Sequence, residues 1–398
     1  MTPRRRIVYV WDADYPWDVR TEKVCNSLTA AGHEVHLVAR NRRWAAPRVE
    51  LPEGTVHRME PWSALGRRAD GALSFPAFFN PRWIGLIDRV VRSTKADLII
   101  ARDLPLCPTA LWVGRRRGVP VLFDMAENYP ALLEDIWATG RARPLDWLVR
   151  NPSLARRVER YVTRRVDRTL VVIEEAAGHL VQLGVPQSSI HVVSNTPPRD
   201  RARDPDTRRT IDIAYLGIME FARGLDLLID ALGRLASAGI HPRTRLIGGG
   251  RDLEELRRRA ESRGLQPGMM EFTGFVPDHR DALAMMGEAR IGVLPHLVND
   301  WARTTIPNKL FDYMAAGMAV LSSDAPPVKR ILDETGAGRT FRAGAAEDLF
   351  VVLREMLADQ AALDRFGRKG RQAIADRYNW EADTAELLRA VDLTVGPR

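Results

Sequence analysis

Residues 306–317 of the chain read IPNKLFDYMAAG, and MAVLSSD follows at residues 318–324. Proline suits the start of a helix and glycine suits its end, so Pro307 and Gly317 predict a short helix between them. Leu310, Phe311 and Met314 fall on one face of this helix, and a buried strand at 319–322 follows. A helix that leads directly into a buried strand is typical of an α/β fold.

Lys309 breaks a local rule within this helix. It lies in the first turn, where the helix dipole disfavours a cation by roughly 0.3–1 kcal/mol. A helix start is also where phosphate groups bind, so Lys309 indicates an anion site. A solvated pair with Asp312, one turn further on, explains the same spacing. Spacing alone leaves both interpretations open.

Strand and helix patterns alternate in both halves of the chain. The expected strands lie at 7–10, 34–39, 97–101, 120–124 and 169–173, then at 211–216, 245–247, 270–272, 291–294 and 319–321. A polar, proline-rich stretch interrupts the pattern between them. We therefore expect two doubly wound α/β domains facing across a cleft. The expected boundaries are 1–196, a linker at 197–209, a second domain at 210–377, and a C-terminal helix at 378–398 packing back on the first domain.

Composition excludes several classes of protein. Hydrophobic residues make up 45% and charged residues 28% of the 398 residues, as in an ordinary globular protein. No stretch approaches the roughly 18 uncharged apolar residues of a membrane span. Cys25 and Cys107 are the only cysteines, which fits a reducing cytoplasm and supports neither a disulfide framework nor a zinc cluster. We expect a cytoplasmic protein.

The net charge of +8 belongs entirely to the first half. Residues 1–198 carry 29 Lys and Arg against 21 Asp and Glu, and the remainder carries 30 of each. Nine arginines lie between Arg141 and Arg168, against three acids. Such a block suits peripheral contact with anionic lipid at the inner face of a membrane, or an anionic substrate. A solvated helix face is the alternative, and no nucleic-acid partner is expected.

Glycines and one arginine follow the strands of the second half. Gly217 ends the strand at 211–216, and Arg223 precedes the next helix, where an arginine can clamp a phosphate. Two further glycine segments, 248–250 and 274–276, follow strands at the same carboxyl edge, where ligands bind in such sheets. The triplet at 248–250 lacks the G-x-G-x-x-G pattern of a dinucleotide loop.

Acidic residues follow two strands of the first half. Asp103 comes after the strand at 97–101, and Asp124 and Glu127 come at and just beyond the end of the strand at 120–124. All three are available for hydrogen bonding or acid–base work, and helix capping is the alternative role. Arg20, which follows the first loop, is a candidate contact for an anionic group.

Residues 307–317 resemble the sugar-nucleotide motif of the retaining GT-B glycosyltransferases of family 4, particularly their bacterial branch. Residues 123–130 resemble the family's D-x-H-E-x-Y-P segment, and 215–224 resemble its strand–glycine–lysine–helix segment. The resemblance implies two Rossmann-like domains and transfer of a hexose from a nucleoside-diphosphate sugar to an acceptor hydroxyl, with retention of configuration. It implies no cofactor and no metal, favours a UDP-sugar over a GDP-sugar, and leaves a lipid-linked or a small-molecule acceptor open.

The resemblance also assigns roles to residues. Those implied at the donor nucleotide are Gly217, Arg223, Gly274, Val276, Thr305, Lys309 and Asp312. Among them Arg223 takes the place of the lysine that neutralises the diphosphate. Asp312 takes the place of the carboxylate, usually glutamate, that holds the ribose hydroxyls. Gly274 and Val276 lie where backbone groups meet the nucleobase. The candidate catalytic residues are Glu127 and Asp124, in the segment that resembles the family's, and Asp103, which follows a strand and would lie in the same crevice.

Two departures from the family pattern leave alternatives open. Ala126 stands where the family has a histidine that supports the reacting sugar, and Thr304 stands where many relatives have a second glutamate. A GT-B sugar-nucleotide epimerase is one alternative. The other is a catalytically weak membrane- or nucleic-acid-binding protein on the same fold.

Overall fold

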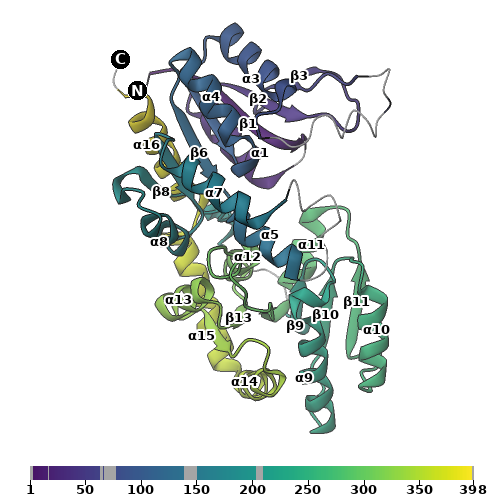
Figure 1. Ribbon diagram of the computed structural model, residues 1–398. Helices are drawn as coiled ribbons and strands as arrows, with labels where there is room; N and C mark the ends of the chain where they lie inside the picture. Colours follow the sequence, from purple (N-terminus) through teal and green to yellow (C-terminus); the bar gives the residue numbers. More distant parts are fainter. Residues whose placement is uncertain are drawn as a thin grey trace. The chain divides into compact units, whose positions relative to one another are not determined.

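The computed structural model describes residues 3–16, 18–62, 66, 78–138, 150–202 and 209–396 (Figure 1). The chain forms two compact units. Unit 1 comprises Met1–Asn195 and Asp383–Arg398, and unit 2 comprises Thr196–Ala382. Two predicted segments lie partly outside the described residues. They are the expected linker, at residues 203–208, and the arginine-rich block, at residues 141–149.

Unit 1 contains an eight-stranded sheet in the order β3-β4-β2-β1-β5-β6-β7-β8. Its strands are β1 (Arg6–Asp14), β2 (Glu34–Arg40), β3 (Arg48–Leu51), β4 (Gly54–Arg58), β5 (Leu98–Arg102), β6 (Val121–Met125), β7 (Arg168–Val171) and β8 (Ile190–Val192). Neighbouring strands are parallel, except that β3 and β4 form an antiparallel hairpin at the edge. The sequence did not predict this hairpin, because exposed and half-buried positions alternate in β3 and leave no apolar run.

The described helices of unit 1 are α1 (Val19–Ala30), α3 (Pro81–Thr94), α4 (Cys107–Arg117), α5 (Tyr129–Ala138), α7 (Pro152–Thr163) and α8 (Glu174–Gln182). Short 3₁₀ turns lie at η2 (Leu104–Leu106) and η3 (Gln187–Ser189). Helix α16 (Trp380–Val395) begins in unit 2, and its larger part belongs to unit 1. Within unit 1, Asp383 of this helix accepts a hydrogen bond of 2.9 Å from the backbone N–H of Ser194.

Unit 2 contains a fully parallel six-stranded sheet in the order β11-β10-β9-β12-β13-β14. Its strands are β9 (Ile211–Leu216), β10 (Thr244–Ile247), β11 (Met270–Gly274), β12 (Ala289–Leu294), β13 (Ala319–Ser323) and β14 (Gly338–Phe341). Its described helices are α9 (Leu225–Ser237), α10 (Leu253–Ser262), α11 (His279–Gly287), α12 (Asn308–Ala315), α13 (Pro326–Thr335), α14 (Ala346–Ala358) and α15 (Gln360–Asp376), with 3₁₀ turns η4 (Arg199–Arg201) and η5 (Phe221–Arg223). The prediction of two α/β domains built on parallel sheets is confirmed.

Helix α12 is the helix predicted from residues 306–317. It begins at Asn308, one residue later than the sequence suggested, because Pro307 keeps an extended backbone with φ −71° and ψ 122°. Gly317 has φ +66°, the left-handed conformation expected after a helix end. Leu310, Phe311 and Met314 are fully buried. Burial of that face fixes α12 against unit 2 and leaves its first turn at the carboxyl edge of the sheet.

In the part of the chain that the structure describes, no helix combines the length and the apolar character needed to cross a membrane.

Candidate functional site

Three strand ends of unit 2 pack backbone against backbone. The N–H of Gly217, after β9, donates to Ile247 O at 2.9 Å, and the N–H of Gly248, after β10, donates to Gly274 O of β11 at 3.1 Å. A Cβ atom on Gly248 would lie 2.0 Å from Gly217 O. Only glycine permits this approach, so the carboxyl ends of β9, β10 and β11 form one closely layered edge.

Lys309 lies against this glycine edge. A Cβ atom on Gly217 would lie 2.7 Å from Lys309 Cε, so the lysine side chain occupies the space that the glycine leaves. Burial lowers the pKa of Lys309, Asp312 raises it and Arg223 lowers it further. A buried lysine whose charged form is disfavoured by a neighbouring arginine indicates a site for an anion.

Neither Arg223 nor Lys309 forms an ion pair with a carboxylate among the described residues of unit 2, although Asp312 raises the pKa of Lys309 electrostatically. Neither side chain forms a hydrogen bond or an ion pair with another described residue. The guanidinium of Arg223 lies 5.7 Å from the ring centroid of Trp301. Since a half-buried cation normally gains a carboxylate or carbonyl partner, these two are arranged for a ligand that the structure does not contain.

His296 and Trp301 complete the group of side chains around these cations. Burial, then the charges of Arg223 and Lys309, lower the pKa of His296 to about 3, so its imidazole is neutral at pH 7. His296 Nδ1 and Trp301 Nε1 are both buried and have no hydrogen-bond partner among the described residues. Buried polar atoms without partners are rare in folded proteins, so both atoms are open to a ligand.

Sequence reasoning missed His296 and Trp301. Both lie between β12 and α12, in a segment without strand or helix periodicity. The available signal was that two polar aromatic residues follow a buried strand at the carboxyl edge of the sheet.

The other predicted donor-side residues lie around the same edge. Asp312 is one turn beyond Lys309 on α12 and lies 4.0 Å from Arg201, measured between Oδ1 and Nη1. Thr305 is half-buried and precedes α12. Gly274 ends β11 with φ +71°, and Val276 is half-buried two residues beyond it. The structure thus brings Gly217, Arg223 and Lys309 together, with Asp312 beside them and Gly274 two strands away.

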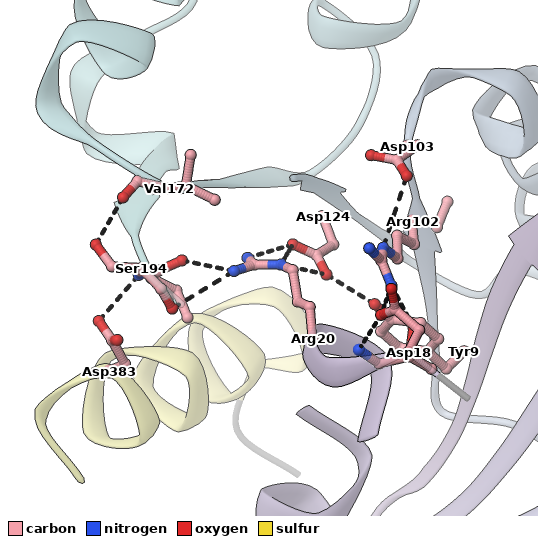
Figure 2. Close-up of polar contacts among 12 residues, drawn as sticks. Tyr9, Asp18, Arg20, Arg102, Asp103, Asp124, Val172, Ser194 and Asp383 are labelled. Atoms are coloured by element: carbon pink, nitrogen blue, oxygen red, sulfur yellow. Dashed lines mark hydrogen bonds and ion pairs between the residues drawn. The ribbon is translucent and has the colours of Figure 1, made fainter. Parts of the chain in front are cut away.

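In unit 1, Asp124 is fully buried and holds a dense set of hydrogen bonds (Figure 2). Its carboxylate accepts from Arg20 Nη2 at 2.5 Å, from Arg20 Nε at 3.0 Å and from Tyr9 Oη at 2.8 Å. Arg20 Nη1 donates to Val193 O at 2.9 Å. The expectation that Arg20 contacts an anionic group of a ligand is therefore wrong, because its charge is neutralised by Asp124 inside the unit.

Asp103 differs from Asp124 in its surroundings. Its φ of 57° with ψ 161° lies in a region that glycine populates and other residues avoid. Its Oδ2 lies 3.6 Å from Arg102 Nε, whereas its Oδ1 is buried without a hydrogen-bond partner among the described residues. Burial raises its pKa to about 7, against the opposing charge of Arg102; Glu127 and Asp124 add to the rise.

Arg102 links this acid to the start of α1. It donates to the side chain of Asp18 (Figure 2) and to that of Thr21. Its guanidinium lies 4.7 Å from the ring centroid of Trp11. Glu127, half-buried after β6, acts electrostatically on Asp103. Unit 1 therefore places its three predicted acids in one cluster, in which Asp124 is neutralised and Asp103 retains a free oxygen.

Among the residues that the structure describes, no group of three or more His, Cys, Asp or Glu side chains is arranged to hold a metal ion.

Two family models match the chain, one in each half. Residues 18–196 match the glycosyl transferase 4-like domain, and residues 210–359 match the glycosyl transferases group 1.

Curated relatives with named activities are distant. The chain is 28% identical to a phosphatidyl-myo-inositol mannosyltransferase of Mycolicibacterium smegmatis over 185 residues, which are 46% of this chain and 45% of that protein. It is 24% identical to a glycogen synthase of Mycobacterium tuberculosis over 301 residues, 73% of this chain and 67% of that protein. The chain thus spans about half the length of the first relative.

Solved structures extend the likeness over the whole chain. A sucrose-phosphate synthase from Thermosynechococcus elongatus aligns with a TM-score of 0.74 at 15% identity, covering 98% of each chain. HepE from Anabaena, in complex with UDP, aligns with a TM-score of 0.71 at 12% identity, covering 97% of this chain and 99% of that one. At such identities the likeness shows the fold, which is GT-B.

Proposed function

Since the chain belongs to the glycosyltransferases with a GT-B fold, we propose that it transfers a hexose from a nucleoside-diphosphate sugar to an acceptor hydroxyl. In this proposal the donor is a UDP-sugar rather than a GDP-sugar, and the sugar keeps its anomeric configuration. The proposal for the donor rests on the position of Lys309 against Gly217, with Arg223 nearby and with neither cation hydrogen-bonded or ion-paired to a carboxylate among the described residues.

The donor diphosphate binds at the carboxyl edge of unit 2 in this proposal. Arg223, Lys309 and the backbone N–H groups at the start of α12 meet its oxygens. Phosphate binding favours the charged form of Lys309, which burial disfavours. His296 and Trp301 supply two further polar atoms, Nδ1 and Nε1, to the phosphate or to the sugar hydroxyls. Asp312 holds the ribose hydroxyls.

The chemical step breaks the bond between the anomeric carbon and the diphosphate oxygen and forms a bond to the acceptor oxygen. Negative charge grows on the departing diphosphate, and Arg223 and Lys309 stabilise that charge. The departing phosphate accepts the proton of the acceptor hydroxyl. Because two cations and a helix start supply the positive charge, the proposal needs no metal ion.

Asp103 and Glu127 are the proposed acceptor-side residues of unit 1. Asp103 has an unpartnered oxygen and a pKa of about 7, which suits a group that exchanges a hydrogen bond or a proton at neutral pH. Asp124 has a positioning role instead, since Arg20 and Tyr9 occupy its carboxylate.

The test is incubation of the purified protein with UDP-, GDP- and ADP-hexoses, with and without candidate acceptors, in buffer containing EDTA. Nucleotide release that requires an acceptor supports transfer, and nuclear magnetic resonance of the product gives its anomeric configuration. An isomerised donor formed without acceptor would instead indicate an epimerase. Failure to bind any nucleoside diphosphate would overturn the proposal.

A further inference from the structure

Aromatic and basic side chains surround a hollow on the surface of unit 1. The hollow has a volume of about 420 Å³ and is lined by Phe79, Pro108, Trp112, Arg115, Arg116 and Tyr161. Pro108 to Arg116 belong to α4 and Tyr161 belongs to α7, two helices that pack against each other (Figure 1). None of these residues belongs to the acidic cluster or to the donor edge.

The aromatic rings of the hollow are exposed although their helices are amphipathic. Helix α4 buries Cys107, Ala110, Leu111 and Val113 against the sheet, whereas Trp112 remains 39% exposed. Tyr161 on α7 is 38% exposed, and Phe79 is 51% exposed. The backbone N–H of Phe79 donates to Thr109 Oγ1 at 3.2 Å, which holds this residue beside α4. Three exposed rings around one hollow form an apolar surface that the unit itself does not cover.

A stripe of α7 extends this surface. On α7, Leu154, Arg157 and Tyr161 follow one another at three- and four-residue spacing, so their side chains share one face, and Arg165 lies in the turn just beyond the end of the helix. Leu154 is exposed, and the guanidinium of Arg165 lies 4.2 Å from the centroid of the Tyr161 ring. The guanidinium of Arg116 lies 5.3 Å from the Trp112 ring in the same way. Apolar and cationic groups therefore alternate across both helices.

Four arginines of this surface have no acidic partner among the described residues. No described carboxylate forms an ion pair with Arg115, Arg116, Arg157 or Arg165. The neighbouring Arg117 and Arg156 do have one, in Asp88 and Glu134. A surface with this excess of positive charge attracts an anionic partner.

We infer that this surface of α4 and α7 docks on a membrane that contains anionic phospholipids. Arg115 and Arg116 meet headgroup phosphates at the hollow, and Phe79, Trp112, Tyr161 and Leu154 lie at the boundary between headgroups and acyl chains. A lipid surface fits better than single-stranded nucleic acid, because exposed Leu154 needs an apolar partner and the rings surround one hollow instead of forming a row for successive bases. The inference goes beyond sugar transfer and does not depend on it.

Vesicle binding tests the inference. The full chain is sedimented with vesicles of phosphatidylglycerol and phosphatidylcholine mixed equally, and with vesicles of phosphatidylcholine alone. Binding to the anionic vesicles alone is expected, with an affinity that falls as salt rises. Arg115→Gln with Arg116→Gln should weaken it at least tenfold, since each basic residue near an anionic surface contributes about 1 kcal/mol. Trp112→Ala should also weaken binding to the anionic vesicles. The binding that remains should depend more strongly on salt concentration, because it is mainly electrostatic.

Arg354→Gln is the matched control. Arg354 is an exposed arginine over an aromatic ring, 5.3 Å from the centroid of Phe350, but it belongs to unit 2. Its loss should leave vesicle binding unchanged, and unchanged circular dichroism should show that all variants are folded. The inference is overturned if the protein binds both kinds of vesicle equally or binds neither. It is also overturned if the α4 variants bind anionic vesicles as tightly as the control does. A single-stranded oligonucleotide that binds this surface more tightly than the vesicles do would displace the protein from them. That result would assign the surface to nucleic acid and would also overturn the inference.

Discussion

At the scale of single residues, the side chains that break a local rule are those with a proposed role. Lys309 is a cation in the first turn of a helix, His296 Nδ1 and Trp301 Nε1 are buried polar atoms without partners, and Asp103 has a backbone conformation that favours glycine. Each of these features costs stability in the folded protein. Contact with a ligand offsets the cost at Lys309 and at the two unpartnered atoms, whereas the backbone strain at Asp103 remains.

Lys309→Ala should weaken UDP binding more than tenfold, because the variant loses a desolvated cation beside the diphosphate. Titration calorimetry measures the change. The matched control is Lys329→Ala on α13, where the lysine is half exposed and pairs with Asp333 at 2.6 Å. Equal affinity of the Lys309 variant and the control for UDP would remove Lys309 from the donor site.

Asp103→Asn should stabilise the protein more at pH 8 than at pH 5. The pKa of Asp103 is raised to about 7 in the folded protein, against about 3.9 for an ordinary aspartate. Between these values the folded protein holds a proton that the unfolded chain has released, so stability falls as pH rises through this window. The asparagine variant has no such loss. Urea unfolding of both proteins at pH 5 and pH 8 measures the difference in their free energies of unfolding. If the variant gains the same stability at both pH values, the pKa of Asp103 is not raised.

At the scale of elements, ends of helices and strands position the charged groups. The side chain of Asp18 caps α1 by accepting from the N–H of Thr21 at 2.8 Å. Arg20, one residue into the helix, then reaches Asp124 at the end of β6 and Val193 after β8. One buried guanidinium thus ties a helix to two strands of the sheet.

Asp124→Asn should lower the free energy of unfolding by about 3–5 kcal/mol, because it leaves the buried charge of Arg20 without a counter-charge. The double variant Arg20→Met with Asp124→Leu should lose less than that, since neither buried charge remains. Denaturant unfolding measures both. Asp333→Asn, which breaks the exposed pair with Lys329, is the control and should change stability by about 1 kcal/mol or less. A loss for Asp124→Asn no larger than the control's would show that the Arg20 pair does not hold unit 1 together.

At the scale of the whole molecule, each unit has its own sheet, and the proposed roles divide between them. The cations of the donor edge belong to unit 2, whereas the acid cluster and the surface of α4 and α7 belong to unit 1. A ligand that binds only the folded donor edge stabilises the unit that carries it.

UDP should therefore raise the thermal midpoint of the protein more than UMP does. Ligand at a hundred times its dissociation constant stabilises a folded protein by about 2.7 kcal/mol. UMP has one phosphate fewer for Arg223 and Lys309 to contact, so it binds more weakly. Scanning calorimetry measures both shifts, and the difference between them should shrink in Lys309→Ala. An equal rise with UMP and UDP would contradict a diphosphate site.

The sequence determined the pattern of elements and the residue types at the ends of strands. Alternating apolar runs are local properties of the chain, so they predicted two α/β units and the helix of residues 308–315. They also predicted Gly217 and Asp103 just after strands, and Arg223 and Lys309 at or before helix starts. The edge hairpin of β3 and β4 escaped prediction, because an edge strand needs no apolar run.

Only the tertiary structure decided which of these residues meet and which are neutralised. Lys309 lies against Gly217 because β9, β12 and β13 are neighbours in the sheet, although about 90 residues separate the two in the sequence. The same holds for Arg20 and Asp124, whose pairing leaves Asp103 as the acid with a free oxygen. Which side chains become buried and which charges pair depends on the order of the strands in the sheet. A local sequence pattern does not determine that order. The stretch at residues 306–317 therefore predicted its own helix, and the order of the strands around it supplied the partners of its lysine.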